Sequence, residues 1–211
     1  MTMKRILTCI AACLFSAALL SAQTPDEIIA RMDEAMSKIK PETGMKMGMD
    51  ISIPIIGKTS SDIWILGEKT RMEVSLKDEK STIWMDETTT WTYTPKDNEV
   101  VIENRKPSDS STTDDNLGLV NSVTEGYNVK LEKETADAWY FNCTKSKSNT
   151  KKDDPRKMSL VVDKNTYVAK NLSARTKGIT ITLRDMASGV TADDVTYDPS
   201  KLPGVKVTDK R

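Results

Sequence analysis

The sequence predicts a mainly β protein with two helices, whose strands, about eleven in number, form one large closed or half-closed sheet. Two observations lead to this fold class. First, the spacing of apolar residues changes at Gly44 from the helical period of about 3.6 to the strand period of about 2. Second, the alternating segments that follow are separated by short polar breaks of hairpin length, which is typical of an antiparallel meander.

The start of the chain has the pattern of a secretory signal peptide. A short basic region at residues 4–5 is followed by an apolar run at 6–20 and by small residues before Gln23. The apolar run is too short, and wrongly flanked, for a membrane span. We therefore expect a signal peptide at residues 1–22 and a single domain at 23–211, a length that suits one sizeable core.

An alternative interpretation places a lipid anchor in the same segment. Ile10 to Cys13, IAAC, resembles a lipobox, in which the cysteine becomes a lipidated N-terminus. The apolar run before Cys13 is short, and mostly apolar residues would remain after it, which favours the signal peptide. The domain then keeps one cysteine, Cys143, which cannot form an internal disulfide and which we expect to be buried on a strand.

The composition argues against an enzyme and against nucleic-acid binding. The chain has 31 Lys and Arg against 31 Asp and Glu, and loss of the two signal-peptide cations leaves 29 against 31, a net charge of −2. A nucleic-acid binder needs a basic face. The chain has no histidine, which removes the commonest general base and metal ligand. We expect no catalytic residue, metal or cofactor, because the adjacent carboxylates lie in polar loops as solvated turn acids: Asp114-Asp115, Asp153-Asp154 and Asp193-Asp194.

One amphipathic helix is predicted near the start of the domain. Residues 24–27, TPDE, form a capping box with proline at the first helical position. Pro41 and Gly44 end the helix. Its apolar stripe must lie on an apolar surface and consists of Ile28, Ile29, Met32, Ala35, Met36 and Ile39.

Two groups of strands follow the helix. The first group predicts an antiparallel meander of six strands, at residues 45–53, 63–66, 71–76, 82–85, 90–94 and 99–103. The second group lies at residues 127–132, 139–144, 157–163, 167–175 and 178–186, and an extended tail follows at 195–207. Between the groups, Asp114 or Asp115 caps a predicted short helix that carries Leu117, Leu119, Val120 and Val123.

The apolar residues leave two interpretations open. Nine methionines follow the signal peptide, but only one phenylalanine, Phe141. Methionine adapts to variable apolar partners, whereas a core with a single packing would prefer stiffer side chains. For any one methionine, ordinary core filling is the better interpretation, but together they favour an adaptable apolar cavity. In the hairpin at 85–105, Trp91 and Tyr93 share one strand face.

Four segments resemble the LolA family of periplasmic lipoprotein carriers of Gram-negative bacteria. They are DIWILGEKTRMEV (62–74), MDETTTWTYTPKDNEVVI (85–102), LVVDKNTYVAKNL (160–172) and YDPSKLPGVKVTD (197–209), and they occur in the order found in that family. The resemblance implies a single incomplete antiparallel β-barrel of about eleven strands. The N-terminal amphipathic helix and the short second helix would form a lid over an apolar interior that holds acyl chains.

The resemblance also implies a set of site residues. The lipid-binding cavity would be lined by Met45, Met47, Met49, Ile51, Trp64, Leu66, Met72, Val74, Trp91 and Tyr93. The lid would contribute Ile28, Ile29, Met32, Met36, Leu117 and Val120. The family places an arginine, which bonds to the lid and governs opening, at the position of Gly67. Lys69 or Arg71 could act as the gating cation instead, but the gating mechanism cannot be carried over.

The resemblance further implies a periplasmic, monomeric carrier of acylated lipoproteins or related lipids. Its protein partners would be an inner-membrane releasing complex and an outer-membrane acceptor. The alternative is a non-transporting sensor or interaction module that uses the same barrel to bind a protein partner. Fold alone does not choose between them. A carrier should copurify with lipid, whereas a sensor should bind its partner whether or not lipid is present.

Overall fold

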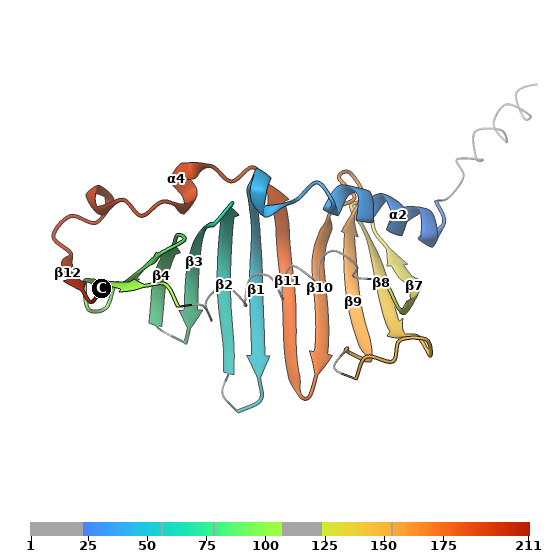
Figure 1. Cartoon of the computed structure of the whole chain (residues 1–211). Helices are drawn as coiled ribbons and strands as arrows, with labels where there is room; N and C mark the ends of the chain where they lie inside the picture. Colours follow the sequence, from blue (N-terminus) through green and yellow to red (C-terminus); the bar gives the residue numbers. More distant parts are fainter. Residues whose placement is uncertain (1–22, 56, 78, 107–123, 153) are drawn as a thin grey trace, which may run out of the picture.

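The computed structural model describes residues 23–55, 57–77, 79–106, 124–152 and 154–211, and the structural statements below concern these residues. One twelve-stranded sheet forms the body of the molecule (Figure 1), in the order β12-β6-β5-β4-β3-β2-β1-β11-β10-β9-β8-β7. The edge strands β12 and β7 do not pair with each other within the described residues, so the barrel is incomplete. The predicted mainly β half-barrel with a helix is therefore confirmed.

Helix α2 (Pro25–Met36) begins at the predicted capping box. The Thr24 hydroxyl accepts a hydrogen bond from the N–H of Glu27 at 3.3 Å, and the Glu27 carboxylate accepts one from the N–H of Thr24 at 2.9 Å. This reciprocal pair satisfies backbone donors that the first helical turn leaves free. A short 3-10 helix, η1 (Pro41–Thr43), leads to the first strand.

The first meander consists of six antiparallel strands, as predicted. Strand β2 is longer than the predicted 63–66, because its polar first half pairs with the backbone of β1 from Ile53 to Met49. The strands are β1 (Met45–Ile53), β2 (Gly57–Leu66), β3 (Lys69–Leu76), β4 (Glu79–Met85), β5 (Thr89–Thr94) and β6 (Glu99–Asn104).

The second group contains the five predicted strands. They are β7 (Tyr127–Glu134), β8 (Ala138–Lys145), β9 (Lys157–Asp163), β10 (Ala169–Thr176) and β11 (Ile179–Ser188). Strand β11 pairs with β1, which joins the two groups into one sheet. The short helix predicted at 117–123 lies outside the described residues.

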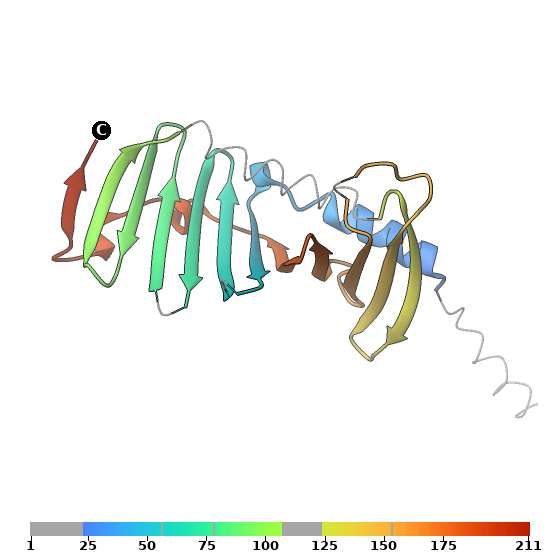
Figure 2. The ribbon, with the colours of Figure 1, turned by 90° about the horizontal axis from the view of Figure 1, so that it is seen from below.

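The tail differs from the extended segment that the sequence predicts. It forms α4 (Ala192–Val195), η2 (Pro199–Lys201) and a twelfth strand, β12 (Lys206–Asp209). Strand β12 pairs with β6 in parallel, so the sheet is not purely antiparallel. The physical reason is a crossover connection, since the chain travels along one end of the strands from β11 to the far edge before it enters the sheet (Figures 1 and 2).

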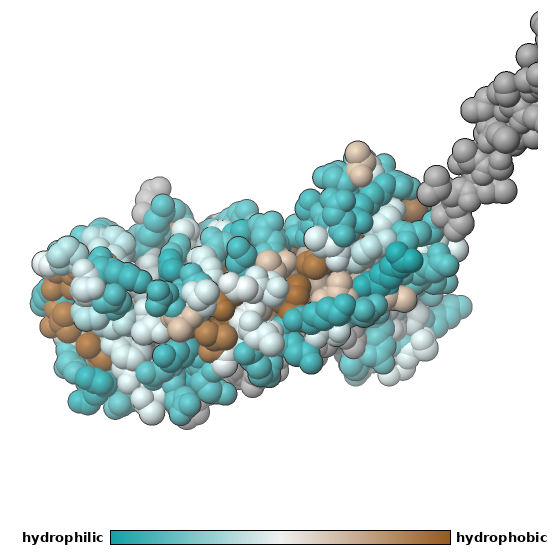
Figure 3. All heavy atoms as spheres, turned by 90° about the horizontal axis from the view of Figure 1, so that it is seen from above, coloured by the Kyte–Doolittle hydropathy of each residue, from teal (hydrophilic) through white to brown (hydrophobic). Residues whose placement is uncertain are grey.

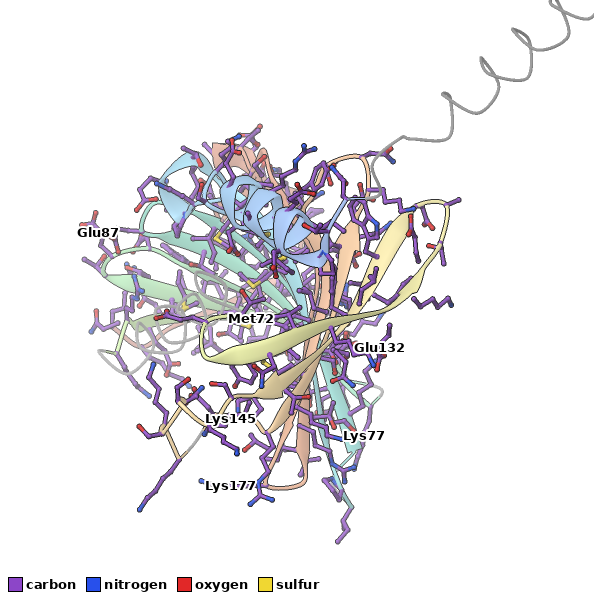
Figure 4. The ribbon with its side chains drawn as sticks, turned by 90° about the vertical axis from the view of Figure 1, so that its right-hand side faces the viewer. Met72, Lys77, Glu87, Glu132, Lys145 and Lys177 are labelled. Carbon is purple, nitrogen blue, oxygen red and sulfur yellow. The ribbon has the colours of Figure 1, made fainter. Side chains whose placement is uncertain are left out.

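Side chains alternate between an inner face, which curves around α2, and an outer face (Figure 4). The packed core lies between α2 and the inner faces of β1 and β8–β11. Its fully buried members include Ile28, Met32, Met45, Phe141, Cys143, Leu160 and Leu183. Methionine therefore does fill part of this core, beside the single phenylalanine of the domain.

The outer face has a second apolar cluster beneath the tail. The Tyr197 ring centroid lies 5.5 Å from the ring of Trp84 and 5.5 Å from that of Trp91. On the neighbouring strand β6, Val100 and Ile102 are buried. Figure 3, which looks down on the tail and α2, shows apolar residues at the β12 end and in a band midway along the molecule.

Candidate apolar binding site

The candidate site is the inner face of strands β1–β4, beside the packed core. The pairing places Met47 next to Ile63, Ile63 next to Met72, and Met72 next to Ile83. A second row on the same face consists of Met49, Ser61, Val74 and Ser81. Residues directly opposite in adjacent strands lie on one face about 5 Å apart, so the two rows form one continuous surface.

Burial decreases along this surface away from α2. Met45 and Met47 are 1% and 5% exposed and belong to the packed core. Met49 and Ile63 are half-buried and pack against the border of that core. Beyond them the surface continues through three half-buried apolar side chains, Met72, Val74 and Ile83. Ile51, also half-buried, extends the surface along β1 toward the β1–β2 turn.

The chemistry of this surface suits an alkyl chain. Among the described inner-face positions of β1–β4, one side chain is ionisable, that of Glu79 at the start of β4. The polar groups on this surface are hydroxyls, such as those of Ser61 and Thr70. Figure 4 shows Met72 within the curve of the sheet, below α2. A surface of this kind can remove methylene groups from water.

The expected lid helix packs on the inner face of β1 and β8–β11, beside the candidate site, with its stripe buried. Ile28, Met32 and Met36 are at most 3% exposed, and Ile29 is half-buried against the same core. Two further residues expected in the lid, Leu117 and Val120, lie outside the described residues.

Tyr167, in the turn between β9 and β10, fixes the first half of α2. Its hydroxyl accepts hydrogen bonds from Gln23 Nε2 and from Arg31 Nη1, both at 2.9 Å. The Arg31 guanidinium lies 5.2 Å from the Tyr167 ring centroid, and that ring packs against Trp139 at 5.4 Å. The sequence analysis did not select Tyr167, because its pattern marks it only as the first residue of the predicted strand at 167–175.

The position expected for a gating arginine makes a backbone contact instead. The N–H of Gly67 donates to the carbonyl oxygen of Pro41 at 2.8 Å, which ties the β2–β3 turn to the segment after α2. The two candidate gating cations are on the outer face. Lys69 donates to the Thr196 hydroxyl at 3.4 Å. Arg71 lies 4.6 Å from the Trp64 ring centroid. Among the described residues these contacts do not join either cation to α2, and the cationic gate stays a prediction.

Four of the residues expected in the cavity lie on the opposite face from the methionines. Trp64 pairs with Lys46, and Trp91 pairs with Trp84 and Ile102, all on the outer face. Leu66 and Tyr93 lie on the same outer face, because each is two residues further along the strand that carries Trp64 or Trp91. The expected single wall of Met45, Met72 and Trp91 is therefore wrong in its aromatic part. Trp91 packs against Tyr197 and so fastens the tail.

The remaining expected cavity residues do come together. Met45, Met47, Met49, Ile51, Met72 and Val74 all share the inner face. Two residues that the sequence analysis did not select, Ile63 and Ile83, complete the row between them. Ile63 belongs to the run Ile63–Leu66, in which all four residues are apolar. Because apolar residues then occupy both faces of the strand, their spacing does not show which face is buried.

Cys143 is the most strongly shifted titratable group of the inner face. Burial raises the pKa of its thiol to about 11. The side chain lies in the packed core opposite Met158 and is a free cysteine. Within the described part of the chain, no group of three His, Cys, Asp or Glu residues could hold a metal ion. In that same part, no helix has the length and apolar character needed to span a membrane.

Comparison with known proteins gives distant structural similarities. The sequence matches no protein-family profile and no curated protein. Among solved structures, LprF from Mycobacterium bovis is similar with a TM-score of 0.49 and 9% identity, covering 83% of this chain and 100% of that one. A LolA superfamily protein from Nitrosomonas europaea is similar with a TM-score of 0.32 and 14% identity, covering 85% of this chain and 100% of that one. A chain of the MucA/MucB complex of Pseudomonas aeruginosa is similar with a TM-score of 0.40 and 10% identity, covering 82% of this chain and 60% of that one.

These similarities carry no argument, because each of the three TM-scores is below 0.5 and each of the three identities is at most 14%. The fold assignment rests on the chain's own elements. A helix, a six-strand meander and a second group of five strands follow one another in the expected order, and the sheet stays open. The architecture is an incomplete β-barrel with a helix on the inner face, which is the architecture that the resemblance in the sequence implies.

Proposed function

We propose that the chain is a periplasmic carrier that binds the acyl chains of lipoproteins, or of related lipids, on its inner face and takes them toward the outer membrane. The observation that carries this proposal is the row Met47, Ile63, Met72 and Ile83, which leaves the packed core and continues as an uncharged, half-buried apolar surface. The signal-peptide pattern at residues 1–22 supports export.

The energetics of such a role are simple. Each methylene group that leaves water contributes about 0.8 kcal/mol, so a carried acyl chain needs apolar cover along its length. Four strands about 4.8 Å apart give the row a span of about 14 Å, enough for much of one chain. Helix α2 would then act as the lid, and an inner-membrane releasing complex and an outer-membrane acceptor would be the partners of a monomeric carrier.

The test measures bound lipid directly. The protein is purified from the periplasm without detergent and extracted with organic solvent, and the extract is analysed by mass spectrometry; acylated species should be present. The delipidated protein should bind a fluorescent fatty acid that acylated peptide displaces. Met72→Lys should weaken this binding at least about tenfold, because the new charge loses water without gaining a partner.

The matched control places the same charge on the other face of the same strand. Ser75 pairs with Ser60 and Lys80, on the outer face of β3. Ser75→Lys should therefore bind the fatty acid as the parent does. If the parent carries no lipid and binds no fatty acid, the carrier proposal fails and the chain is better explained as a non-transporting sensor or interaction module.

A further inference from the structure

The tip of the β1–β2 hairpin presents an apolar side chain to solvent. Ile55 is fully exposed, at 106% of its reference area, and its φ is +75°. A positive φ is sterically unfavourable for a β-branched residue and is usually left to glycine or asparagine. The hairpin therefore holds an isoleucine where neither burial nor backbone geometry explains it, and strain of this kind is a reason to look for function.

Neighbouring turns at the same end of the sheet surround this tip. A side-chain carbon on Gly178, in the β10–β11 turn, would lie 3.9 Å from Pro54, so the two turns are in contact. Leu76, at the end of β3 on the same side, is 40% exposed. Two of the three large apolar residues that are exposed among the described residues thus lie at this end. We call the described parts of residues 52–58, 76–80, 145–157 and 175–178 the hairpin rim.

Charge is distributed unequally between the two ends of the strands. The described residues of the hairpin rim contain eleven Lys and Arg against two acids, Glu79 and Asp154. The cations are Lys58, Lys77, Lys80, Lys145, Lys147, Lys151, Lys152, Arg156, Lys157, Arg175 and Lys177. The turns at the opposite end, at 67–68, 86–88, 135–137 and 164–168, contain Glu68, Asp86, Glu87 and Asp137 against Lys164. Figure 4 shows Lys77, Lys145 and Lys177 at the end away from α2, and Glu87 far from them.

We propose that the hairpin rim docks on the surface of an anionic lipid bilayer. Ile55 would enter the interface between headgroups and acyl chains, and the basic residues of the β8–β9 and β10–β11 connections would contact the lipid phosphates. Neither signal is sufficient alone, because stable but reversible attachment to a membrane surface combines apolar insertion with a basic patch. Long lysine side chains can also reach the headgroups from a distance.

The acidic turns at the opposite end set the orientation of the docked molecule. An anionic surface attracts the hairpin rim more strongly than the end that carries Glu68 and Glu87, so the strands stand on the membrane with α2 away from it. This inference does not depend on the acyl-chain site, because Ile55 lies at a hairpin tip outside the inner-face row. Membrane docking and acyl-chain binding can therefore fail or succeed separately.

Vesicle cosedimentation with the chain from Gln23 onward, which contains the whole described fold, tests the proposal. The parent should bind vesicles of equimolar phosphatidylcholine and phosphatidylglycerol, bind pure phosphatidylcholine vesicles much less, and dissociate when salt is raised to about 1 M. Ile55→Gly should weaken binding roughly fivefold while relieving the backbone strain, so a folding defect cannot explain the loss. Ile55→Trp should strengthen binding, because indole rings favour the membrane interface.

Matched controls separate the rim from the rest of the surface. Val207, on β12, is 52% exposed, and Val207→Ser should bind vesicles as the parent does. The double variant Lys147→Gln/Lys152→Gln should lose about 25-fold in affinity for anionic vesicles. Lys40→Gln/Lys201→Gln, which removes two exposed cations outside the rim, should lose little. Equal binding to both vesicle types, no binding by the parent, or equal effects of the rim and control variants would each overturn the proposal.

Discussion

At the scale of single residues, Cys143 shows what full burial does to a reactive group. Burial raises the pKa of its thiol from 9.0 to about 11 because the thiolate loses hydration. The folded state therefore favours the neutral thiol more than the unfolded state does. The stability from this difference is fully present below about pH 9 and is lost as the pH rises through about 11.

We expect this thiol to be inert in the native protein. At about pH 8 a thiol-specific reagent should label Cys143 only as fast as the protein unfolds, and labelling should become rapid in denaturant. Replacement by alanine should remove the part of the stability that is lost between about pH 9 and 11 in urea titrations. Rapid labelling of the folded protein would show that the inner face near β8 admits solvent and is not packed.

At the scale of elements, local signals predicted more than long-range ones. The capping box of α2 and the strand alternation of β1 depend on neighbouring residues, and both appear as predicted. The short α4 was missed because four residues cannot establish a helical period, and η1 was likewise too short to be predicted. Strand β12 was expected only as an extended tail, since its parallel pairing with β6 joins segments about a hundred residues apart.

The division of the site residues between two faces illustrates the same limit. Alternation within a strand says that Trp91 and Tyr93 share a face, but not which face that is. The choice is set by the register between strands, and a shift by one residue reverses it. Met72 and Trp91 are separated by two hairpin registers, which the sequence does not specify. Alternation alone places Met45, Met47 and Met49 on one face because they lie on one strand, whereas the face of Trp91 also depends on its packing against Tyr197 of the tail.

Helix α2 gives a prediction at this scale. Met32 is 1% exposed, so Met32→Lys should destabilise the domain by at least about 3 kcal/mol, because the ammonium group is buried without a partner. Met32→Leu, which nearly conserves volume, should cost less than about 1.5 kcal/mol. Urea unfolding followed by tryptophan fluorescence measures both. If Met32→Lys is as stable as Met32→Leu, the helix lifts easily from the sheet and is not part of a permanent core.

At the scale of the whole molecule, one sheet is divided into a packed half and a less packed half. Between α2 and strands β1 and β8–β11 the inner face is filled, and its side chains include Phe141 and Leu160. On β2–β4 the same face bears half-buried apolar residues, while the tail packs against the opposite, outer face. Among the described residues, the tail therefore packs the second half from outside, while the inner face of that half keeps half-buried apolar side chains.

This division predicts opposite responses to the same substitution at two methionines of β1. Met45 is 1% exposed within the packed core, so Met45→Trp should cost about 1–3 kcal/mol through overpacking. Met49 is half-buried at the border of the apolar surface, so Met49→Trp should cost less than about 1 kcal/mol and should lower the capacity for a fluorescent fatty acid by filling part of the site. Urea unfolding and fatty-acid titration of the two variants, side by side with the parent, provide the comparison. If Met49→Trp destabilises the domain as much as Met45→Trp does, the inner face of β1–β4 is packed shut, and no acyl chain enters there.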